Sequence, residues 1–144
     1  QLFAKVNTTI TKAHFSADRY ITHQGQQLNI KGNVTPYAPE LLICTSISYE
    51  SKYGFGMRLA YKYVGEQYTD LLNSIAPSPD GRVGIMPSYN LFDATARYHM
   101  TKIKTTVNFA VKNLTNERYI STRRPQGIRV GMPRYFMVGL NYDF

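Results

Sequence analysis

Arginines near the C-terminal end are the side chains in this sequence best suited to chemistry. Five of them fall within one short stretch, Arg118, Arg123, Arg124, Arg129 and Arg134. A guanidinium group stays positively charged and binds a carboxylate through two parallel hydrogen bonds. The chemistry that the sequence predicts is therefore anion binding, and the alternative is that these arginines are simply hydrated. The candidate ligand-binding residues are Arg82, Arg123, Arg124 and Arg129.

Residue patterns that could support bond chemistry do not occur in the sequence. The three histidines, at positions 14, 23 and 99, lack the spacing of metal ligands. There is no Ser/His/Asp set, no carboxylate pair and no glycine-rich phosphate loop. Cys44 is the single cysteine, and we interpret it as a small side chain packed in a wall rather than a reactive thiol. We expect no catalytic residue, no metal site, no covalently bound cofactor and no enzymatic activity.

The net charge limits the classes of partner. It is +8 over 144 residues, which suits a nucleic acid, an anionic lipid surface or an anionic ligand. Nucleic-acid binding is disfavoured because the arginines lack an aromatic platform on which bases could stack. No apolar run approaches the roughly 18 residues of a membrane-spanning helix, so an α-helical membrane protein is excluded.

Six segments alternate apolar and polar side chains with the period of a β-strand. They span about 2–14, 39–50, 55–68, 89–100, 103–113 and 136–144. Such lengths suit a tilted membrane strand and exceed the soluble average of about five or six residues. Short turns at 51–54 and 99–102 alternate with long loops at 15–38, 69–88 and 114–133. This alternation is typical of outer-membrane barrels, whose turns are short on the periplasmic side and long outside.

The predicted fold class is therefore all-β. We expect an antiparallel up-and-down transmembrane β-barrel segment of six strands, with aromatic side chains forming girdles at the strand ends. Six strands cannot close a membrane barrel, because the smallest have about eight. The sequence opens without an initiator methionine or signal peptide, so we expect a piece of a longer protein or a mature form. Residues 1–144 are predicted to be the C-terminal portion of that barrel.

The polar face of these strands is expected to line the barrel lumen. Its wall charges are predicted to be Arg58, Lys62, Asp93 and Arg97, with Asp93 beside Arg58 or Lys104. The final strand is expected to run to the last residue. Its glycine, tyrosine and terminal phenylalanine resemble the insertion signal of outer-membrane barrels, and they are Gly139, Tyr142 and Phe144. The alternative for this stretch is an ordinary edge strand of a soluble β-domain.

Several motifs resemble the C-terminal barrel of TonB-dependent outer-membrane receptors. Around the second long loop they read Y-V-G-E-Q-Y-T-D (63–70), D-G-R (80–82) and I-M-P-S-Y (85–89). Later they read V-K-N-L-T-N-E-R-Y (111–119) and G-M-P-R (131–134). The asparagines and the Gly-Met-Pro segment also suit a structural role, because Asn starts turns and Pro is tolerated at a strand's first residue. The resemblance covers almost the whole chain, residues 2–144.

The resemblance implies a barrel of about 22 strands with a plugged lumen, of which these would be the last six. It implies energised import of an iron chelate, ferric citrate or another siderophore, as the transported ligand. The implied partners within the same protein are its plug domain and the rest of the barrel, which are absent here. The implied external partners are the inner-membrane TonB complex, the barrel assembly machinery and outer-membrane lipid. The implied location is the bacterial outer membrane, with the C-terminus in the periplasm.

Two other functions remain open on the sequence. A passive, porin-like outer-membrane channel would have the same wall without a plug, and a plug sequence upstream of residue 1 would separate the two. A soluble β-sandwich binding module would pack the alternating apolar faces into a core. The long loops of about twenty residues count against the sandwich.

Overall fold

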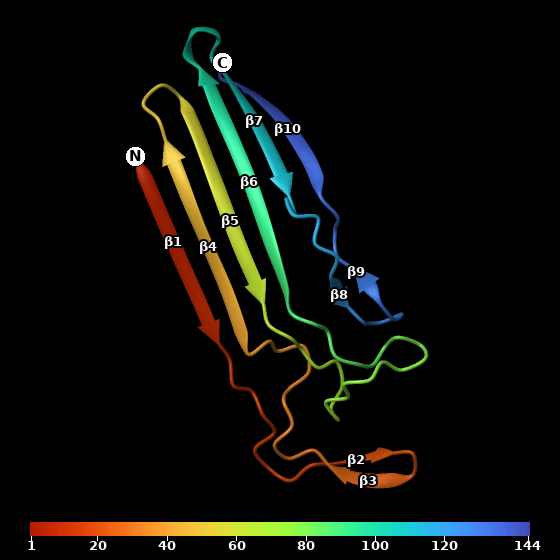
Figure 1. Cartoon of the computed structure of the whole chain (residues 1–144). Helices are drawn as coiled ribbons and strands as arrows, with labels where there is room; N and C mark the ends of the chain where they lie inside the picture. The colour runs from red at the N-terminus through yellow and green to blue at the C-terminus, as the bar shows by residue number, and fades with distance from the viewer.

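The computed structural model describes residues 1–144 and contains one six-stranded antiparallel sheet (Figure 1). The strands lie in the order β1-β4-β5-β6-β7-β10. Their bounds are β1 Leu2–Ile10, β4 Leu41–Glu50, β5 Phe55–Val64, β6 Tyr89–Met100, β7 Thr105–Lys112 and β10 Tyr135–Tyr142. Every pairing in the sheet is antiparallel, and β1 and β10 are its two open edges. The all-β fold and the six strands are confirmed.

The strand register places the apolar side chains of all six strands on one face. Leu59 of β5 stands opposite Ile47 of β4 and Ala94 of β6. Phe109 of β7 stands opposite Val138 of β10. Since side chains alternate between faces, this pairing carries a continuous apolar surface across the sheet, and the polar side chains share the other face.

No second layer covers either face of this sheet. Only 12 of the 144 residues are buried, and apolar side chains at the two edges are open, with Val6 76% exposed and Val138 73% exposed. Fully buried Ile30 and Thr69 lie among the long loops rather than between layers. The structure therefore lacks the packed core that a β-sandwich requires. No helix in the structure has the length and apolar character needed to cross a membrane.

Short turns and long loops lie at opposite ends of the sheet (Figure 1). The β4–β5 turn depends on Gly54, which has φ +84°, and a Cβ there would lie 2.6 Å from the carbonyl oxygen of His99. The β6–β7 turn contains a 3₁₀ turn, η1 Thr101–Ile103, and ends at Lys104 in the left-handed conformation. The C-terminus lies at this short-turn end.

Strand boundaries differ from the predicted ones where the alternating pattern continues into a turn or loop. β1 ends at Ile10, β5 ends at Val64, and β7 begins only at Thr105, after the 3₁₀ turn. The final strand ends at Tyr142, which pairs with Thr105. Beyond it the backbone N–H of Asp143 still bonds to the Lys104 carbonyl at 2.9 Å, and Phe144 is fully exposed. The prediction that the strand runs to the last residue was wrong.

Two small hairpins occur inside the predicted long loops. β2 Tyr20–His23 pairs with β3 Gln26–Asn29, and β8 Ile120–Thr122 pairs with β9 Arg129–Val130. The first is closed by Gln24 and Gly25, both with positive φ. Two-residue turns of this kind match the twist of the flanking strands. The Gln-Gly pair is therefore a local signal for this hairpin, which was not predicted from the sequence.

Candidate functional site

Two of the long loops meet through the side chain of Arg123. They are the β5–β6 loop (residues 65–88) and the β7–β10 loop (residues 113–134). Arg123 is 5% exposed, and its guanidinium donates from Nη1 to the Gly81 carbonyl and from Nη2 to the Ile85 carbonyl, both at 3.1 Å. Its Nε is buried without a partner. One arginine of the β7–β10 loop is thus inserted into the β5–β6 loop.

Two glycines allow the backbones of these loops to approach closely. A Cβ on Gly127 would lie 2.8 Å from the carbonyl oxygen of Asp80, and a Cβ on Gly81 would lie 3.3 Å from the side chain of Ile128. Both glycines also have positive φ, a conformation that other residues adopt only with strain. The contact between the loops therefore needs glycine on both sides as well as the arginine between them.

The tip of the β5–β6 loop is ordered by the carboxylate of Asp80. This carboxylate accepts hydrogen bonds from the hydroxyl of Ser78 and from the backbone N–H of Arg82 at 3.1 Å. These two bonds hold the pKa of Asp80 below its usual value, the Ser78 bond having the larger effect and the charge of Arg82 adding to it. Asp80 remains a carboxylate, and Arg82 Nε lies 3.7 Å from it.

The four arginines predicted to bind ligand divide into two groups. Arg123 is buried, and two of its nitrogens are occupied by backbone carbonyls. Arg82, Arg124 and Arg129 are exposed on the same pair of loops. Arg124 makes one long hydrogen bond from Nη2 to the Thr69 carbonyl, at 3.4 Å. The structure thus brings the four onto one loop pair and leaves three guanidinium groups available to solvent.

A second cluster explains the Lys-Asn-Leu-Thr motif at the end of β7. Asp93 of β6 accepts a hydrogen bond from Lys112 Nζ at 2.8 Å and another from the backbone N–H of Asn113 at 3.0 Å. The amide of Asn113 donates to the carbonyls of Glu117 and Met132, both at 2.9 Å, and accepts from the Glu117 N–H at 2.8 Å. Asn113 thus closes its own turn and ties it to the return of the chain.

The neighbouring motif residues complete this structural cluster. Asn116 accepts a hydrogen bond from the backbone N–H of Arg134 at 3.0 Å, and Arg134 Nη1 donates to the Leu114 carbonyl at 3.4 Å. Asn113 and Asn116 both have positive φ, which Asn tolerates better than most residues. The structural role predicted for the two asparagines is confirmed.

The predicted wall charges lie together on the polar face of the sheet, but their ion-pair partners differ from the predicted ones. Arg97 Nη2 lies 2.8 Å from Glu50 Oε2. Asp93 pairs with Lys112 and not with Arg58 or Lys104, because the β6–β7 register brings residue 93 opposite residue 112. The Lys112–Asp93 pair joins the neighbouring strands β7 and β6, whereas the Arg97–Glu50 pair reaches from β6 to β4 across Gly56 of β5.

Two tyrosines at the loop end of the sheet stack on each other. The rings of Tyr89 and Tyr119 have centroids 4.2 Å apart and an interplanar angle of 23°. The ring of Tyr119 also covers Gly131, where a Cβ would lie 1.9 Å from Cζ of that ring. The glycine of the Gly-Met-Pro-Arg motif therefore serves to admit an aromatic ring, a tertiary contact that the sequence could not show.

Comparison with known proteins places this sheet in a family. Residues 5–114 match the family model described as TonB dependent receptor-like, beta-barrel. The chain belongs to this family of TonB-dependent receptors. The match begins within β1 and runs past the end of β7, so it includes residues of every strand of the six-stranded sheet except β10. No curated protein matches the chain significantly.

Solved structures of a siderophore receptor, a ferric citrate transporter and a ferric yersiniabactin uptake receptor share the fold. The siderophore receptor PiuA from Acinetobacter baumannii is 18% identical with a TM-score of 0.79, covering 98% of this chain and 19% of that one. The ferric citrate transporter FecA is 24% identical with a TM-score of 0.69, covering 77% and 18%. The ferric yersiniabactin uptake receptor FyuA from Yersinia pestis is 24% identical with a TM-score of 0.59, covering 77% and 17%. This chain spans less than a fifth of the length of each of these proteins.

Proposed function

We propose that this chain is the C-terminal part of the wall of an outer-membrane receptor that imports an iron chelate by TonB-dependent transport. The observation that carries the proposal is the family match across β1 to β7. It is supported by three similar solved structures, which are a ferric citrate transporter, a siderophore receptor and a ferric yersiniabactin uptake receptor. On this proposal the protein is a receptor and transporter, and not an enzyme.

The open sheet would be completed by earlier strands of the same barrel. The unpaired edges of β1 and β10 carry backbone groups that lipid cannot satisfy, so the sheet requires further strands on both sides. We infer a closed barrel of about 22 strands around a plug domain. The apolar face would contact outer-membrane lipid and the polar face the lumen. The barrel assembly machinery would insert the wall, with Gly139, Tyr142 and Phe144 as its signal.

The short turns and long loops support one orientation of the receptor in the membrane. The short turns and the C-terminus would lie in the periplasm, and the long loops outside the cell (Figure 1). The joined β5–β6 and β7–β10 loops would then stand at the outer mouth of the barrel. Arriving chelate would meet them first, and the inner-membrane TonB complex would pull on the plug from the other side.

The ligand that these loops suit best is a carboxylate-rich ferric chelate such as ferric citrate. The exposed guanidinium groups of Arg82, Arg124 and Arg129 would bind its carboxylates, and their positive potential would steer it to the mouth. Arg123 would hold the two loops in place for this binding. The chelate is cargo, so the protein would move the chelate across the membrane and break no covalent bond.

Titration of the full-length receptor with ferric citrate tests the proposal. We expect Arg124→Gln and Arg129→Gln each to weaken binding by about tenfold or more, because a hydrogen bond to a charged group contributes roughly 1.5 to 3 kcal/mol. Arg19→Gln is the matched control, since Arg19 is exposed on a different loop, where its guanidinium stacks on Phe15. Unchanged affinity in both loop variants would contradict these residue roles, and no binding of any ferric chelate by the wild-type receptor would contradict the function.

A passive channel is the alternative function for the same wall. It predicts that the full-length protein conducts ions across a planar bilayer without removal of any plug domain. A plugged receptor stays closed in the same measurement. The family match favours the receptor.

A further inference from the structure

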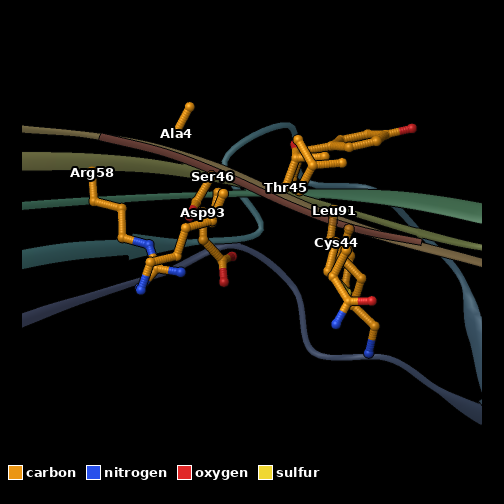
Figure 2. A pocket seen from close by; sticks show the side chains of 13 residues that line it. Ala4, Cys44, Thr45, Ser46, Arg58, Leu91 and Asp93 are labelled. Carbon is orange, nitrogen blue, oxygen red and sulfur yellow. The ribbon is translucent and has the colours of Figure 1, made fainter. Parts of the chain in front are cut away.

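The exposed arginines proposed to bind the chelate depend on contacts between loops for their positions. The hollow in the polar wall that Figure 2 shows is lined entirely by residues of β1, β4, β5 and β6, so none of these loop arginines belongs to it. Among them, Arg124 is held by the other loop, because its Nη2 donates to the Thr69 carbonyl at 3.4 Å. The group that fixes Thr69 therefore decides where this guanidinium lies.

Thr69 begins a bend in the β5–β6 loop, residues 69–74, here called the Thr69 bend. Thr69 is fully buried, and its hydroxyl donates to the Gly84 carbonyl at 2.8 Å. The carboxylate of Asp70 closes the bend by accepting hydrogen bonds from the backbone N–H of Leu72 at 3.1 Å and of Ser74 at 2.9 Å. The bend is therefore ordered within itself, and its place in the molecule depends on contacts from outside it.

The β1–β4 loop (residues 11–40) holds the Thr69 bend through Asn73. The side-chain amide of Asn73 accepts a hydrogen bond from the Val34 N–H at 2.7 Å and donates one to the Val34 carbonyl at 2.9 Å. Asn33 adds a bond from its Nδ2 to the Leu71 carbonyl at 2.8 Å. Asn73 thus pairs with the backbone of Val34 on both its donor and its acceptor, as a neighbouring strand would.

The backbone to which Asn73 binds is itself tied to the sheet. Val34 pairs with His14 in an antiparallel bridge. The Thr11 N–H, just after β1, donates to the carbonyl of Glu40, just before β4, at 2.9 Å. The two arms of this loop are thus joined beyond the sheet, and Val34 offers the Thr69 bend a fixed backbone.

We propose that Asn73 is a positioning residue for Arg124, and that the β1–β4 loop thereby sets the affinity of a carboxylate site to which it contributes no arginine. This inference rests on the proposed function, which makes Arg124 a ligand-binding residue. The Thr69 carbonyl takes one N–H donor of the guanidinium and leaves the others for a carboxylate. A guanidinium that is already held loses less rotational freedom on binding, and the difference raises affinity.

Titration of the full-length receptor with ferric citrate tests this role. Asn73→Gly removes both bonds to Val34, and glycine accepts the positive φ of position 73 without strain. We expect this variant to weaken binding by about fivefold, because ordering one long side chain on binding costs about this factor. Gln24→Gly is the matched control, since Gln24 also has positive φ but lies at the tip of the β2–β3 hairpin. It should leave the affinity unchanged.

A double-mutant cycle shows whether Asn73 acts through Arg124. In a receptor that already carries Arg124→Gln, Asn73→Gly should cause no further loss of affinity, whereas in an Arg129→Gln receptor the loss should remain. A loss that persists in the Arg124→Gln receptor would overturn the positioning role, because Asn73 would then act on the loops in general. Unchanged affinity in the Asn73→Gly receptor would overturn it as well.

Chemical modification without ligand separates this inference from the proposed function. Phenylglyoxal reacts with accessible guanidinium groups, and mass spectrometry of the peptides gives a rate for each arginine. We expect Asn73→Gly to raise the rate at Arg124 and to leave the rate at Arg129 unchanged. Equal rates at Arg124 in the wild-type and Asn73→Gly receptors would overturn the positioning role, even if ferric citrate binds.

The opposite combination is also decisive. A raised rate at Arg124 in a receptor that binds no ferric chelate would support the positioning of Arg124 by Asn73 and reject iron uptake. Heat-dependent gel mobility confirms that each variant barrel is folded.

Discussion

Neighbouring arginines at positions 123 and 124 have different surroundings, although sequence treats them alike. Arg123 is buried and bound to two carbonyls of the other loop, whereas Arg124 is exposed and makes one long hydrogen bond. A buried guanidinium that donates to two backbone carbonyls stabilises a local structure, and an exposed one remains available to an anion. At the scale of the residue, burial therefore decides whether an arginine joins the two loops or stays available to an anion.

Asn113 is the residue whose loss should cost the most stability outside the sheet. Its side chain makes three hydrogen bonds, and its backbone has φ +51°. We expect Asn113→Ala to lower the unfolding free energy of the full-length receptor by roughly 2 to 4 kcal/mol, about 1 kcal/mol for each bond plus strain. Denaturant unfolding followed by fluorescence measures this. Asn116→Ala, which removes one such bond, should cost less, and equal losses would contradict the assignment.

At the scale of the element, the β5–β6 and β7–β10 loops form one unit although Arg123 and Gly81 are far apart in sequence. We expect Arg123→Gln to expose both loops to limited proteolysis at a higher rate, because the guanidinium anchors each loop to the other. Arg129→Gln is the matched control, since Arg129 is exposed on the β7–β10 loop, and it should leave the cleavage rates near those of the wild type. Faster cleavage confined to the β7–β10 loop would show that the β5–β6 loop holds its conformation without Arg123.

At the scale of the whole molecule, the sheet has two uncovered faces and two unpaired edges. An exposed apolar face and open edges in water lead to association. We therefore expect residues 1–144 expressed alone to aggregate in plain buffer. The full-length protein should purify from the membrane fraction only in detergent, with a native mass several-fold above 16.5 kDa and with bound ferric chelate. A monodisperse 16.5 kDa species in plain buffer would contradict the barrel.

The sequence by itself determined the strands and their faces, because the alternation of apolar and polar side chains is a local property of each segment. It also located the Asn113 turn and the arginine-rich loop. Only the tertiary structure decided which charges pair, since Asp93 meets Lys112 through the register of two strands. The burial of Arg123 and the ring of Tyr119 over Gly131 likewise depend on segments distant in sequence. A period of two fixes the face on which a side chain lies, but its neighbour there is set by strand pairing and loop packing, which no single segment encodes.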